Sequence, residues 1–430
     1  MTKIVAIGIG SVVFGVELLR DLYQTPETRG AEMWLVDLDE GALSRMAGLA
    51  AVLDRASGWG IALHATADRA EALPDADFVV TSIAVDRDRT WRLDHELALK
   101  HGFASVLSEN GGPGGLSHTL RSVPPMVAVA RDIEALAPDA LLLNYTNPEN
   151  RVCLAVYRQT RARSIGLCHG VANTIAWVAD LLGLPRDDVD LRAAGVNHFT
   201  WVTSLRHRPD GRDLLPDLRL ALAAQPPGAW PLCRLLFERL DCFPTTGDDH
   251  VGEYIAWAAE VIGTRGYDFD GFARRRELSE RNIEAWGSGE KAVERLLQRP
   301  SHEARVGHSS AEIIAAVVAG RTLRRPSFIM PNDGYIENID RDAVVEVPGL
   351  IEDGVCTGMS VGRLPGPVAS MVQREIEIQE LAVEAAMTGS RGLALRALLI
   401  DPVVHSARAA EAFLDDVLAT HRNHLPAFAD

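Results

Sequence analysis

The sequence predicts an α/β protein of two domains: a doubly wound parallel sheet over residues 1–190, then a mixed α+β, largely helical domain over residues 191–430. Short apolar runs alternate with helical patterns through residues 1–170, which is typical of parallel strands covered by helices on both faces. The later sequence has longer helical patterns and proline-rich segments instead. A chain of 430 residues also exceeds the usual size of one domain.

The amino-acid composition limits the kinds of molecule that the protein is expected to bind. The formal net charge is −16, and nucleic acids and anionic membranes both require basic patches, so neither is expected as a partner. No apolar run approaches the roughly 18 residues of a transmembrane helix, and residues 1–6 lack the pattern of a signal peptide. The five cysteines, at positions 153, 168, 233, 242 and 356, show no disulfide-like spacing. These observations predict a cytoplasmic protein in a reducing compartment.

The first element is a buried strand over residues 3–9, which ends in glycine. Gly8-Ile9-Gly10-Ser11 then opens a helical pattern, and such glycines let the backbone approach a pyrophosphate at a helix N-terminus. The third glycine of the usual fingerprint would fall at Val13. The alternative interpretation is a plain tight turn between strand and helix.

The second strand, over residues 32–36, ends in Asp37. A carboxylate at this tip can accept hydrogen bonds from a ribose diol and would repel a 2′-phosphate, which favours NAD over NADP. The two strand ends together predict a Rossmann-like domain that binds NAD through Gly8, Gly10, Ser11 and Asp37.

The predicted elements that follow are a helix at 42–56, strands at 62–66 and 78–83, helices at 91–101 and 126–136, a strand at 140–148, a helix at 149–160 and a strand at 164–167. The glycine-rich residues 111–116 are expected to form no regular element. They are either a flexible surface connection or a place where the backbone approaches a ligand.

Two of these strands end in polar residues. The strand at 140–148 ends in a polar tip that contains Asn147, and Cys168 and His169 follow the strand at 164–167. Ligands of open α/β sheets bind at the carboxyl ends of the strands. We therefore expect Asn147 beside a substrate hydroxyl or the nicotinamide, and Cys168 and His169 at the same edge.

In the second half, residues 191–205 are expected to be extended, with a break at Asn197-His198, and residues 206–247 to form loops and short helices. A helix is expected to begin at Asp248. The remaining predicted elements are helices at 272–299 and 309–321, strand-like structure at 327–362 with turns at 331–334 and 348–349, and helices at 367–388, 391–399 and 405–421.

An ordered set of motifs resembles glycoside hydrolase family 4 over nearly the whole chain. The motifs are Gly8-x-Gly10-Ser11, Gly112-Pro113-Gly114-Gly115, Asn144-Tyr145-Thr146-Asn147-Pro148, Cys168-His169, Asn197-His198, Pro331-Asn332-x-Gly334 and Val345-Glu346-Val347-Pro348. The departures are Val13 for the third glycine and Ile339-Asp340 where the family often has Leu-Pro.

The resemblance implies a glycosidase that uses NAD and a divalent metal, typically Mn²⁺, instead of two flanking carboxylates. In the family mechanism, NAD oxidises the C3 hydroxyl of the sugar, a base removes the C2 proton, and the aglycone leaves by elimination. Water then adds at C1 and the hydride returns to C3. Cys168 and His198 carry over to the metal ligands of the family, and a thiolate with an imidazole suits a borderline-soft divalent ion. The alternatives are a buried structural thiol and a core histidine.

The resemblance also suggests acid–base and substrate residues. Asp248 best matches the aspartate that serves in the family as C2 base in enzymes acting on unphosphorylated sugars, and is the preferred candidate for the base; the alternative is a helix N-cap. Tyr254 is the reserve candidate for the base. His169 is expected to assist the leaving group or to contact the sugar.

Cys168-His169, in place of Cys-Asp or Cys-Asn, resembles the branch of the family that hydrolyses unphosphorylated α-glycosides, either hexosides or hexuronides. Family members are usually homo-dimers or homo-tetramers, which is the expectation here. Two other functions are compatible with an NAD-binding first domain: a lactate- or malate-type NAD-dependent 2-hydroxyacid dehydrogenase, and a non-catalytic NAD-binding sensor.

Overall fold

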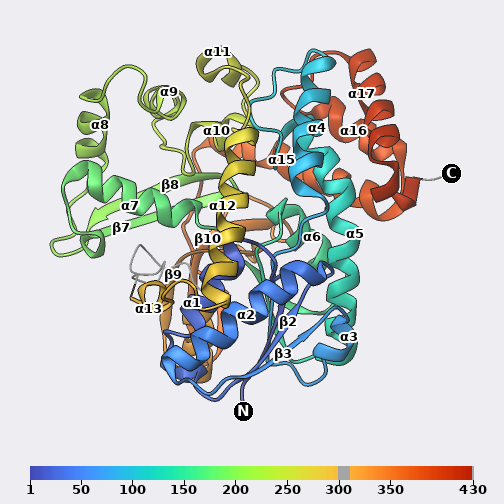
Figure 1. Cartoon of the computed structure of the whole chain (residues 1–430). Helices are drawn as coiled ribbons and strands as arrows, with labels where there is room; N and C mark the ends of the chain where they lie inside the picture. The colour runs from blue at the N-terminus through green and yellow to red at the C-terminus, as the bar shows by residue number, and fades with distance from the viewer. Residues whose placement is uncertain (299–309, 429–430) are drawn as a thin grey trace.

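The computed structural model describes residues 1–298 and 310–428. Its centre is a sheet of eleven strands, which extends from β2 and β3 near the N-terminus to β7 and β8 (Figure 1). Within this sheet β3-β2-β1-β4-β5-β6 lie in this order and are all parallel. This is the strand order of dinucleotide-binding folds, so the predicted α/β class and doubly wound sheet are confirmed. The strands are β1 (Lys3–Ile7), β2 (Glu32–Val36), β3 (Ala62–Thr66), β4 (Phe78–Thr81), β5 (Leu141–Asn144) and β6 (Arg163–Gly166).

Helices cover both faces of this parallel part. In β1, Ile4 and Ala6 belong to one buried cluster, whereas Val5 and Ile7 belong to another on the opposite face. Near-continuous apolar runs are what strands buried on both faces require. The helices are α1 (Phe14–Leu22), α2 (Glu40–Ser57), α3 (Arg69–Ala72), α4 (Arg87–Lys100), α5 (Gly112–Leu136), α6 (Glu149–Gln159) and α7 (Gly170–Leu182).

The second half of the chain extends the same sheet with antiparallel strands. β9 lies beside β6, with Gly166 opposite Ile329, and β10, β7 and β8 follow, while β11 pairs with β10. The strands are β7 (Val189–Val196), β8 (Phe199–His207), β9 (Leu323–Pro331), β10 (Val344–Glu352) and β11 (Val355–Gly358). The sheet thus runs without interruption past residue 190, and the division into domains at this residue stays a prediction.

The second half also supplies most of the remaining helices. They are α8 (Leu215–Ala223), α9 (Pro231–Leu240), α10 (Asp248–Gly252), α11 (Ala258–Ile262), α12 (Phe269–Gly287), α13 (Glu294–Leu297), α14 (Ser310–Val318), α15 (Gly366–Thr388), α16 (Arg391–Ile400) and α17 (Ala407–Thr420). The helix predicted at 272–299 is shorter, because α12 ends at Gly287, and residue 299 lies outside the described residues, as does residue 309 at the start of the next predicted helix. Within the residues that the structure describes, no helix is long and apolar enough to cross a membrane.

The expectation of an irregular segment at 111–116 was wrong, because α5 begins at Gly112. A Cβ on Gly114 would lie 2.3 Å from Ser108 Cβ, and a Cβ on Gly115 would lie 2.5 Å from the carbonyl carbon of Asn110. The glycines therefore allow the first turn of a buried helix to press against residues 108–110. They serve packing within the chain, and neither flexibility nor direct approach to a ligand is needed to explain them.

The turn expected at Pro348-Gly349 was also wrong. Both residues lie inside β10, where the register with β9 shifts between Val347 and Gly349. Glycine and proline are tolerated there because a bulge disrupts the hydrogen-bond ladder locally. The turn that ends β10 comes later, at Asp353-Gly354.

Candidate active site

The loop after β1 has the geometry of a dinucleotide site. Gly8 has φ +80°, and a Cβ on it would lie 2.5 Å from the carbonyl oxygen of Ser82, so only glycine fits. Gly10 donates its N–H to Asp37 Oδ2 at 2.7 Å, and Ser11 Oγ accepts the N–H of Phe14 at the start of α1. The structure therefore brings Gly8, Gly10, Ser11 and Asp37 together at the carboxyl ends of β1 and β2.

Sequence reasoning missed the third glycine of this loop. Val13 is 56% exposed, whereas a Cβ on Gly15 would lie 2.1 Å from the carbonyl oxygen of Ile9. Gly15 thus lets α1 approach the end of β1, two positions later than the usual spacing. The signal was present in the sequence as the next glycine of the helical pattern.

Gly15→Ala should lower the free energy of unfolding by about 1–3 kcal/mol, because the clashing atom belongs to the backbone and cannot rotate away. Gly48→Ala in α2 is the matched control, since its Cβ would meet its nearest atom at 3.9 Å. We expect that control to gain about 0.5–1 kcal/mol from helix propensity. Urea unfolding measures both values, and equal effects of the two substitutions would contradict the close approach at Gly15.

A cavity of about 330 Å³ lies at the same edge of the sheet. It is lined by Cys168, His169, Gly170, Asn173, Thr174, Trp177, His198, Trp230, Thr246 and His250. Cys168 and His169 follow β6, His198 lies in the turn between β7 and β8, and His250 lies in α10. The three predicted residues Cys168, His169 and His198 therefore share one cavity.

Asn110 joins the predicted residues Asn147 and His198. Its Nδ2 lies 3.2 Å from Asn147 Oδ1, 3.4 Å from Asn197 Oδ1 and 3.0 Å from His198 Nδ1. Asn110 Oδ1 is buried and has no hydrogen-bond partner among the described residues. A buried acceptor of this kind suits a ligand group that donates a hydrogen bond. Sequence reasoning missed Asn110, although it directly precedes the glycine-rich residues 111–116.

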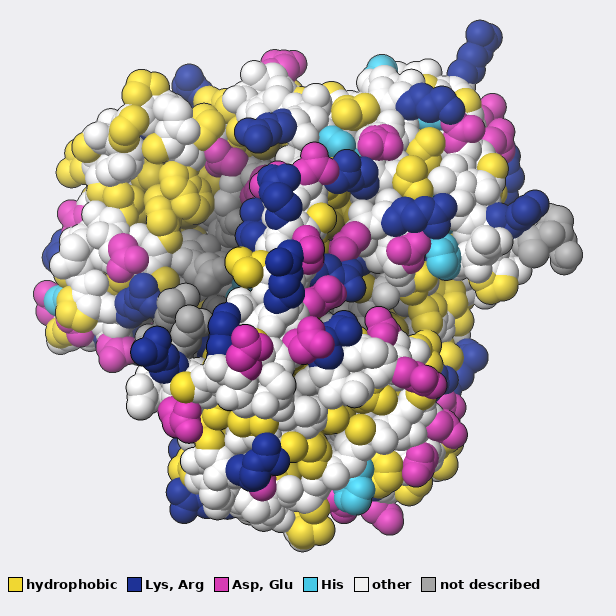
Figure 2. All heavy atoms as spheres, viewed as in Figure 1, with side chains coloured by type: hydrophobic (Ala, Val, Ile, Leu, Met, Phe, Trp, Pro, Cys, Tyr) yellow, Lys and Arg dark blue, Asp and Glu magenta, His cyan; other side chains and the backbone are white. Residues whose placement is uncertain are grey.

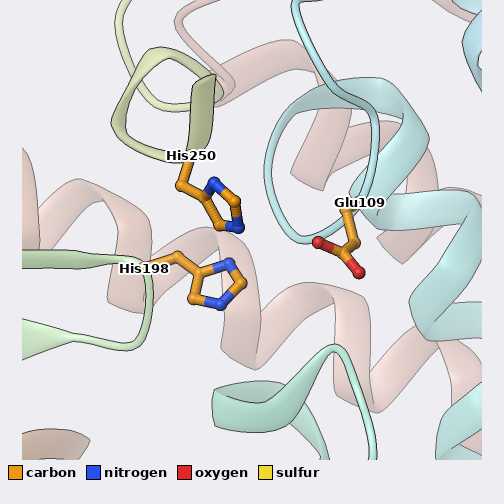
Figure 3. A group of neighbouring side chains, drawn as sticks. All are labelled: Glu109, His198 and His250. Atoms are coloured by element: carbon orange, nitrogen blue, oxygen red, sulfur yellow. The ribbon is translucent and has the colours of Figure 1, made fainter. Parts of the chain in front are cut away.

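Glu109, His198 and His250 converge in a way that suits a metal ion. Each offers one donor atom, and these atoms all lie within 4.8 Å of one another. Figure 3 shows the two imidazole rings side by side, with the Glu109 carboxylate facing them from the loop before α5. Imidazole and carboxylate are ligands of borderline divalent ions, so the donor set fits such an ion. Cys168 lines the same cavity without belonging to this group of three.

Burial and neighbouring charges shift the pKa values of the predicted metal ligands Cys168 and His198. Burial, followed by the carboxylates of Glu346 and Glu149, raises the pKa of the Cys168 thiol well above its usual range. Burial also lowers the pKa of His198, which keeps the imidazole neutral as metal binding requires. A cation in this cavity would offset the negative charges of Glu346 and Glu149 and so favour the thiolate form of Cys168.

None of the candidates for the base lines the cavity. The Asp248 carboxylate accepts the N–H groups of Leu232 and Cys233, the latter at 2.8 Å, at the start of α9. Tyr254 is buried, and its hydroxyl donates to the Asn197 carbonyl at 3.3 Å. The titratable side chain that does line the cavity in this segment is His250.

Asp249 orients His250. Its Oδ1 lies 2.7 Å from His250 Nδ1, so the other ring nitrogen is left for the cavity. Burial opposes protonation of His250, but the hydrogen bond that its Nδ1–H donates to Asp249 and the nearby carboxylates of Asp249, Glu109 and Glu253 outweigh it and raise the pKa of His250 to about 9. The segment therefore carries a carboxylate–imidazole pair, which sequence reasoning did not single out.

Three residues other than glycine that line the cavity have a positive φ: His198 (64°), Trp230 (52°) and Thr246 (73°). Such conformations are costly for residues other than glycine and persist where the surrounding structure imposes them, often at functional sites. His198 occupies the two-residue turn between β7 and β8, a place where glycine would be favoured.

Comparison with known proteins agrees with this geometry. Residues 3–184 match the family described as family 4 glycosyl hydrolase, and residues 193–404 match its C-terminal domain. An alpha-glucosidase of Erwinia rhapontici is 30% identical over 97% of both chains.

Solved structures share the fold along the whole chain. The structure of lplD from Bacillus subtilis, described as a glucosidase, is 26% identical with a TM-score of 0.87, and the match covers 97% of this chain and 100% of that one. A 6-phospho-alpha-glucosidase from gut microorganisms, solved with NAD and Mn²⁺, is 22% identical with a TM-score of 0.83 over 99% of both chains. The two family matches span most of the sequence: the chain belongs to the family 4 glycosyl hydrolases.

Proposed function

We propose that this chain hydrolyses an unphosphorylated α-glycoside with NAD and a divalent metal ion, Mn²⁺, as cofactors. The observation that carries the proposal is the single cavity that collects Cys168, His169 and His198 at the carboxyl edge of the parallel strands. The Erwinia relative is named an alpha-glucosidase, and the gut-microbial enzyme of the same fold binds NAD and Mn²⁺. When bound, the dinucleotide would supply a hydride acceptor and the metal a Lewis acid for substrate oxygens.

Gly8, Gly10 and Ser11 would hold the pyrophosphate, and Asp37 would accept hydrogen bonds from the ribose. Asn147 is the predicted contact to the sugar. The Ile83 N–H donates to Thr146 Oγ1 at 3.0 Å, and this bond ties the strand end behind Gly8 to the residue before Asn147. This hydrogen bond between the two strand ends supports a site in which cofactor and substrate lie next to each other.

Cys168 and His198 are proposed to hold the metal, and Glu109 offers a further donor near His198. Asn197 lies beside His198, and its Nδ2 donates to Glu346 Oε2 at 3.1 Å. The Glu346 carboxylate also accepts from Ser327 Oγ at 2.7 Å. These hydrogen bonds would fix the turn that presents His198.

The residues that line the cavity favour an uncharged sugar as the substrate. Its described residues include no lysine or arginine. Recognition of a phosphate or a carboxylate normally uses an arginine fork or a lysine. Arg87 lies nearby, but the carboxylate of Glu109 already pairs with it. We therefore favour a hexoside over a phosphorylated sugar or a hexuronide, and His169 as a contact to this sugar.

The structure favours His250 over Asp248 as the group that moves the C2 proton. Asp248 is turned to the N-terminus of α9, whereas His250 lines the cavity with Asp249 behind it. A histidine held by a carboxylate is a common arrangement for a general base. The carboxylates around it raise the pKa of His250 to about 9, but a divalent cation bound in the same cavity would lower this pKa and so leave the ring free to accept a proton. Tyr254 would act only by holding the Asn197 carbonyl.

His250→Gln should lower kcat about 10²- to 10⁴-fold while NAD and Mn²⁺ still bind, because a proton acceptor is lost. Asp248→Asn should leave turnover nearly unchanged, since an amide oxygen can still accept the N–H of Cys233. Exchange of the sugar C2 proton with deuterated solvent is the direct readout. Loss of exchange in Asp248→Asn would restore Asp248 as the base, and loss of Mn²⁺ from His250→Gln would make His250 a ligand instead.

A panel of nitrophenyl glycosides, glycuronides and 6-phosphoglycosides tests the function as a whole. We expect cleavage of an α-hexoside that requires both NAD and Mn²⁺, with no net accumulation of NADH. Deuterium at C2 or C3 of the sugar should slow the reaction as a primary isotope effect. Cleavage that is independent of NAD, or confined to phosphorylated sugars, would overturn the proposal.

Assembly into a homo-dimer or homo-tetramer and a cytoplasmic location are proposals that rest on the family and the composition. Sedimentation of the purified protein would test the first.

A further inference from the structure

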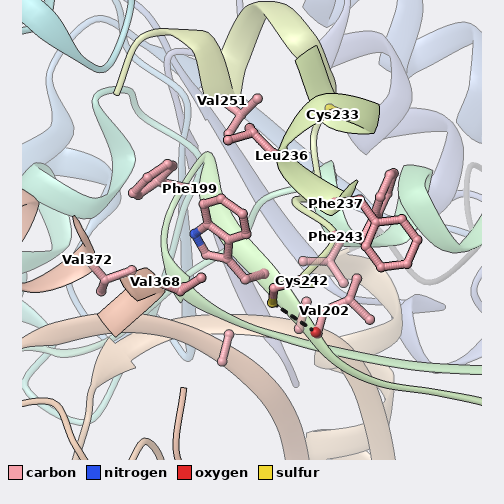
Figure 4. Packing of buried hydrophobic residues seen from close by; sticks show 14 of the residues in the cluster. Phe199, Val202, Cys233, Leu236, Phe237, Cys242, Phe243, Val251, Val368 and Val372 are labelled. Carbon is pink, nitrogen blue, oxygen red and sulfur yellow. Dashed lines mark hydrogen bonds between the residues drawn. The ribbon is translucent and has the colours of Figure 1, made fainter. Parts of the chain in front are cut away.

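The cavity has a second end that the proposed chemistry does not use. Trp177 and Trp230 line it with ring centroids 4.1 Å apart and planes tilted by 33°. Trp177 also stacks on Phe243, at 5.8 Å and 7°. Phe243 is fully buried and belongs to the hydrophobic cluster beneath (Figure 4). Of these three rings, Trp177 and Trp230 are the two that line the cavity.

The position of this stack follows from the helix α7. Gly170, Asn173, Thr174 and Trp177 all line the cavity and recur at three, four and seven residues, which is one face of a helix. Seven residues of α-helix span about 10 Å. The cavity thus runs from Cys168, past the polar side chains of Asn173 and Thr174, to the tryptophans. A single pyranose ring at Cys168 would not reach them.

The backbone of Trp230 supports a role beyond packing. Trp230 has φ 52°, a left-handed conformation that is strained for an aromatic residue, and it is only partly buried. Hydrophobic side chains gather over the region of α8 and α9, and the surface is hollowed between this region and α12 (Figure 2). A strained and partly exposed tryptophan at the wall of a cavity suggests a binding surface.

We propose that Trp230, backed by Trp177 and Phe243, binds the leaving group of the substrate, and that this leaving group is a second pyranose ring. The apolar C–H face of a pyranose matches the negative face of an indole ring, and the described lining residues at this end carry no lysine or arginine that would suit a charged aglycone. The physiological substrate is then an α-linked disaccharide or a larger oligosaccharide. This inference rests on the proposed glycosidase function and specifies the leaving group that the enzyme prefers.

The test compares two substrates that share the reacting sugar and differ in the leaving group: maltose against methyl α-glucopyranoside, or melibiose against methyl α-galactopyranoside if the nitrophenyl panel favours galactosides. In Trp230→Ala, kcat/KM should fall about three- to ten-fold for the disaccharide and hardly at all for the methyl glycoside. Trp230→Phe, which retains a ring, should recover most of the loss. Trp257→Phe is the control, because Trp257 is 40% exposed and is not among the lining residues.

A binding measurement separates this inference from the proposed function. Titration of the NAD- and Mn²⁺-loaded protein with the disaccharide should perturb tryptophan fluorescence in the wild type and in Trp257→Phe, but much less in Trp230→Phe. Equal losses for both substrates, no loss for either, or a larger loss with a nitrophenyl glycoside than with the disaccharide would overturn a sugar site at Trp230. If the wild type cleaves no glycoside at all, the proposed function fails, and the fluorescence titration still decides whether Trp230 binds a disaccharide.

Discussion

His198→Gly is expected to abolish Mn²⁺ binding and to lower glycosidase turnover by at least about a thousand-fold, because the Lewis acid contributes several kcal/mol to the reaction. The same substitution should leave the fold more stable than His198→Ala does. His198 has φ 64°, and this conformation costs a residue with a Cβ about 1–2 kcal/mol relative to glycine. The imidazole is thus held in place at the expense of stability.

The measurements are metal content after dialysis, turnover, and urea unfolding of both variants. Asp353→Gly is the matched control: Asp353 has φ 50° in the turn between β10 and β11 and is not among the residues that line the cavity. It should gain stability without losing turnover. A His198→Gly protein that retains Mn²⁺, or that is less stable than His198→Ala, would contradict the interpretation of this turn.

Cys168→Ser is the second substitution with a large expected effect. It should abolish turnover and metal retention and spare NAD binding, because a serine hydroxyl is a poor ligand for a borderline divalent ion. The thiol needs a nearby cation, since burial and the carboxylates of Glu346 and Glu149 raise its pKa. In the Co²⁺-substituted protein, the thiolate-to-metal absorption band should disappear with this substitution.

Cys356→Ser is the control, because Cys356 lies on β11 and is not among the residues that line the cavity. Full turnover in Cys168→Ser would refute the metal assignment. Retention of Co²⁺ without any thiolate band in the unaltered protein would assign the ion to His198, His250 and Glu109 alone.

Features that depend on local sequence could be predicted well. The period of apolar residues located the parallel strands, and the abrupt ends of these strands in glycine, Asn147 and Cys168 placed the cofactor loop and one wall of the cavity at the same edge. Parallel strands fix this edge by topology alone, so side chains distant in sequence are brought together without any detailed knowledge of packing.

Features that depend on contacts between distant segments could not be predicted. Gly114 and Gly115 look like breakers in isolation, and only the loop at 108–110 explains why a helix begins there. Asn110 carries no signal of its own, because its importance comes from Asn147 and His198, which lie 37 and 88 residues away. The sequence could not show that the Asp248 carboxylate accepts a backbone N–H at the N-terminus of α9. Only this contact makes His250 a better candidate than Asp248 for the group that moves the C2 proton.

The uninterrupted sheet has a consequence for how the protein is made. β6 is complete once residue 166 has been synthesised, but the strand beside it, β9, begins only at residue 323. During synthesis the parallel half therefore exposes an unpaired strand edge while the intervening chain emerges, and such edges invite pairing with other chains. A chain truncated near residue 190 keeps this edge open and should aggregate, whereas the full-length protein closes it with its own later strands.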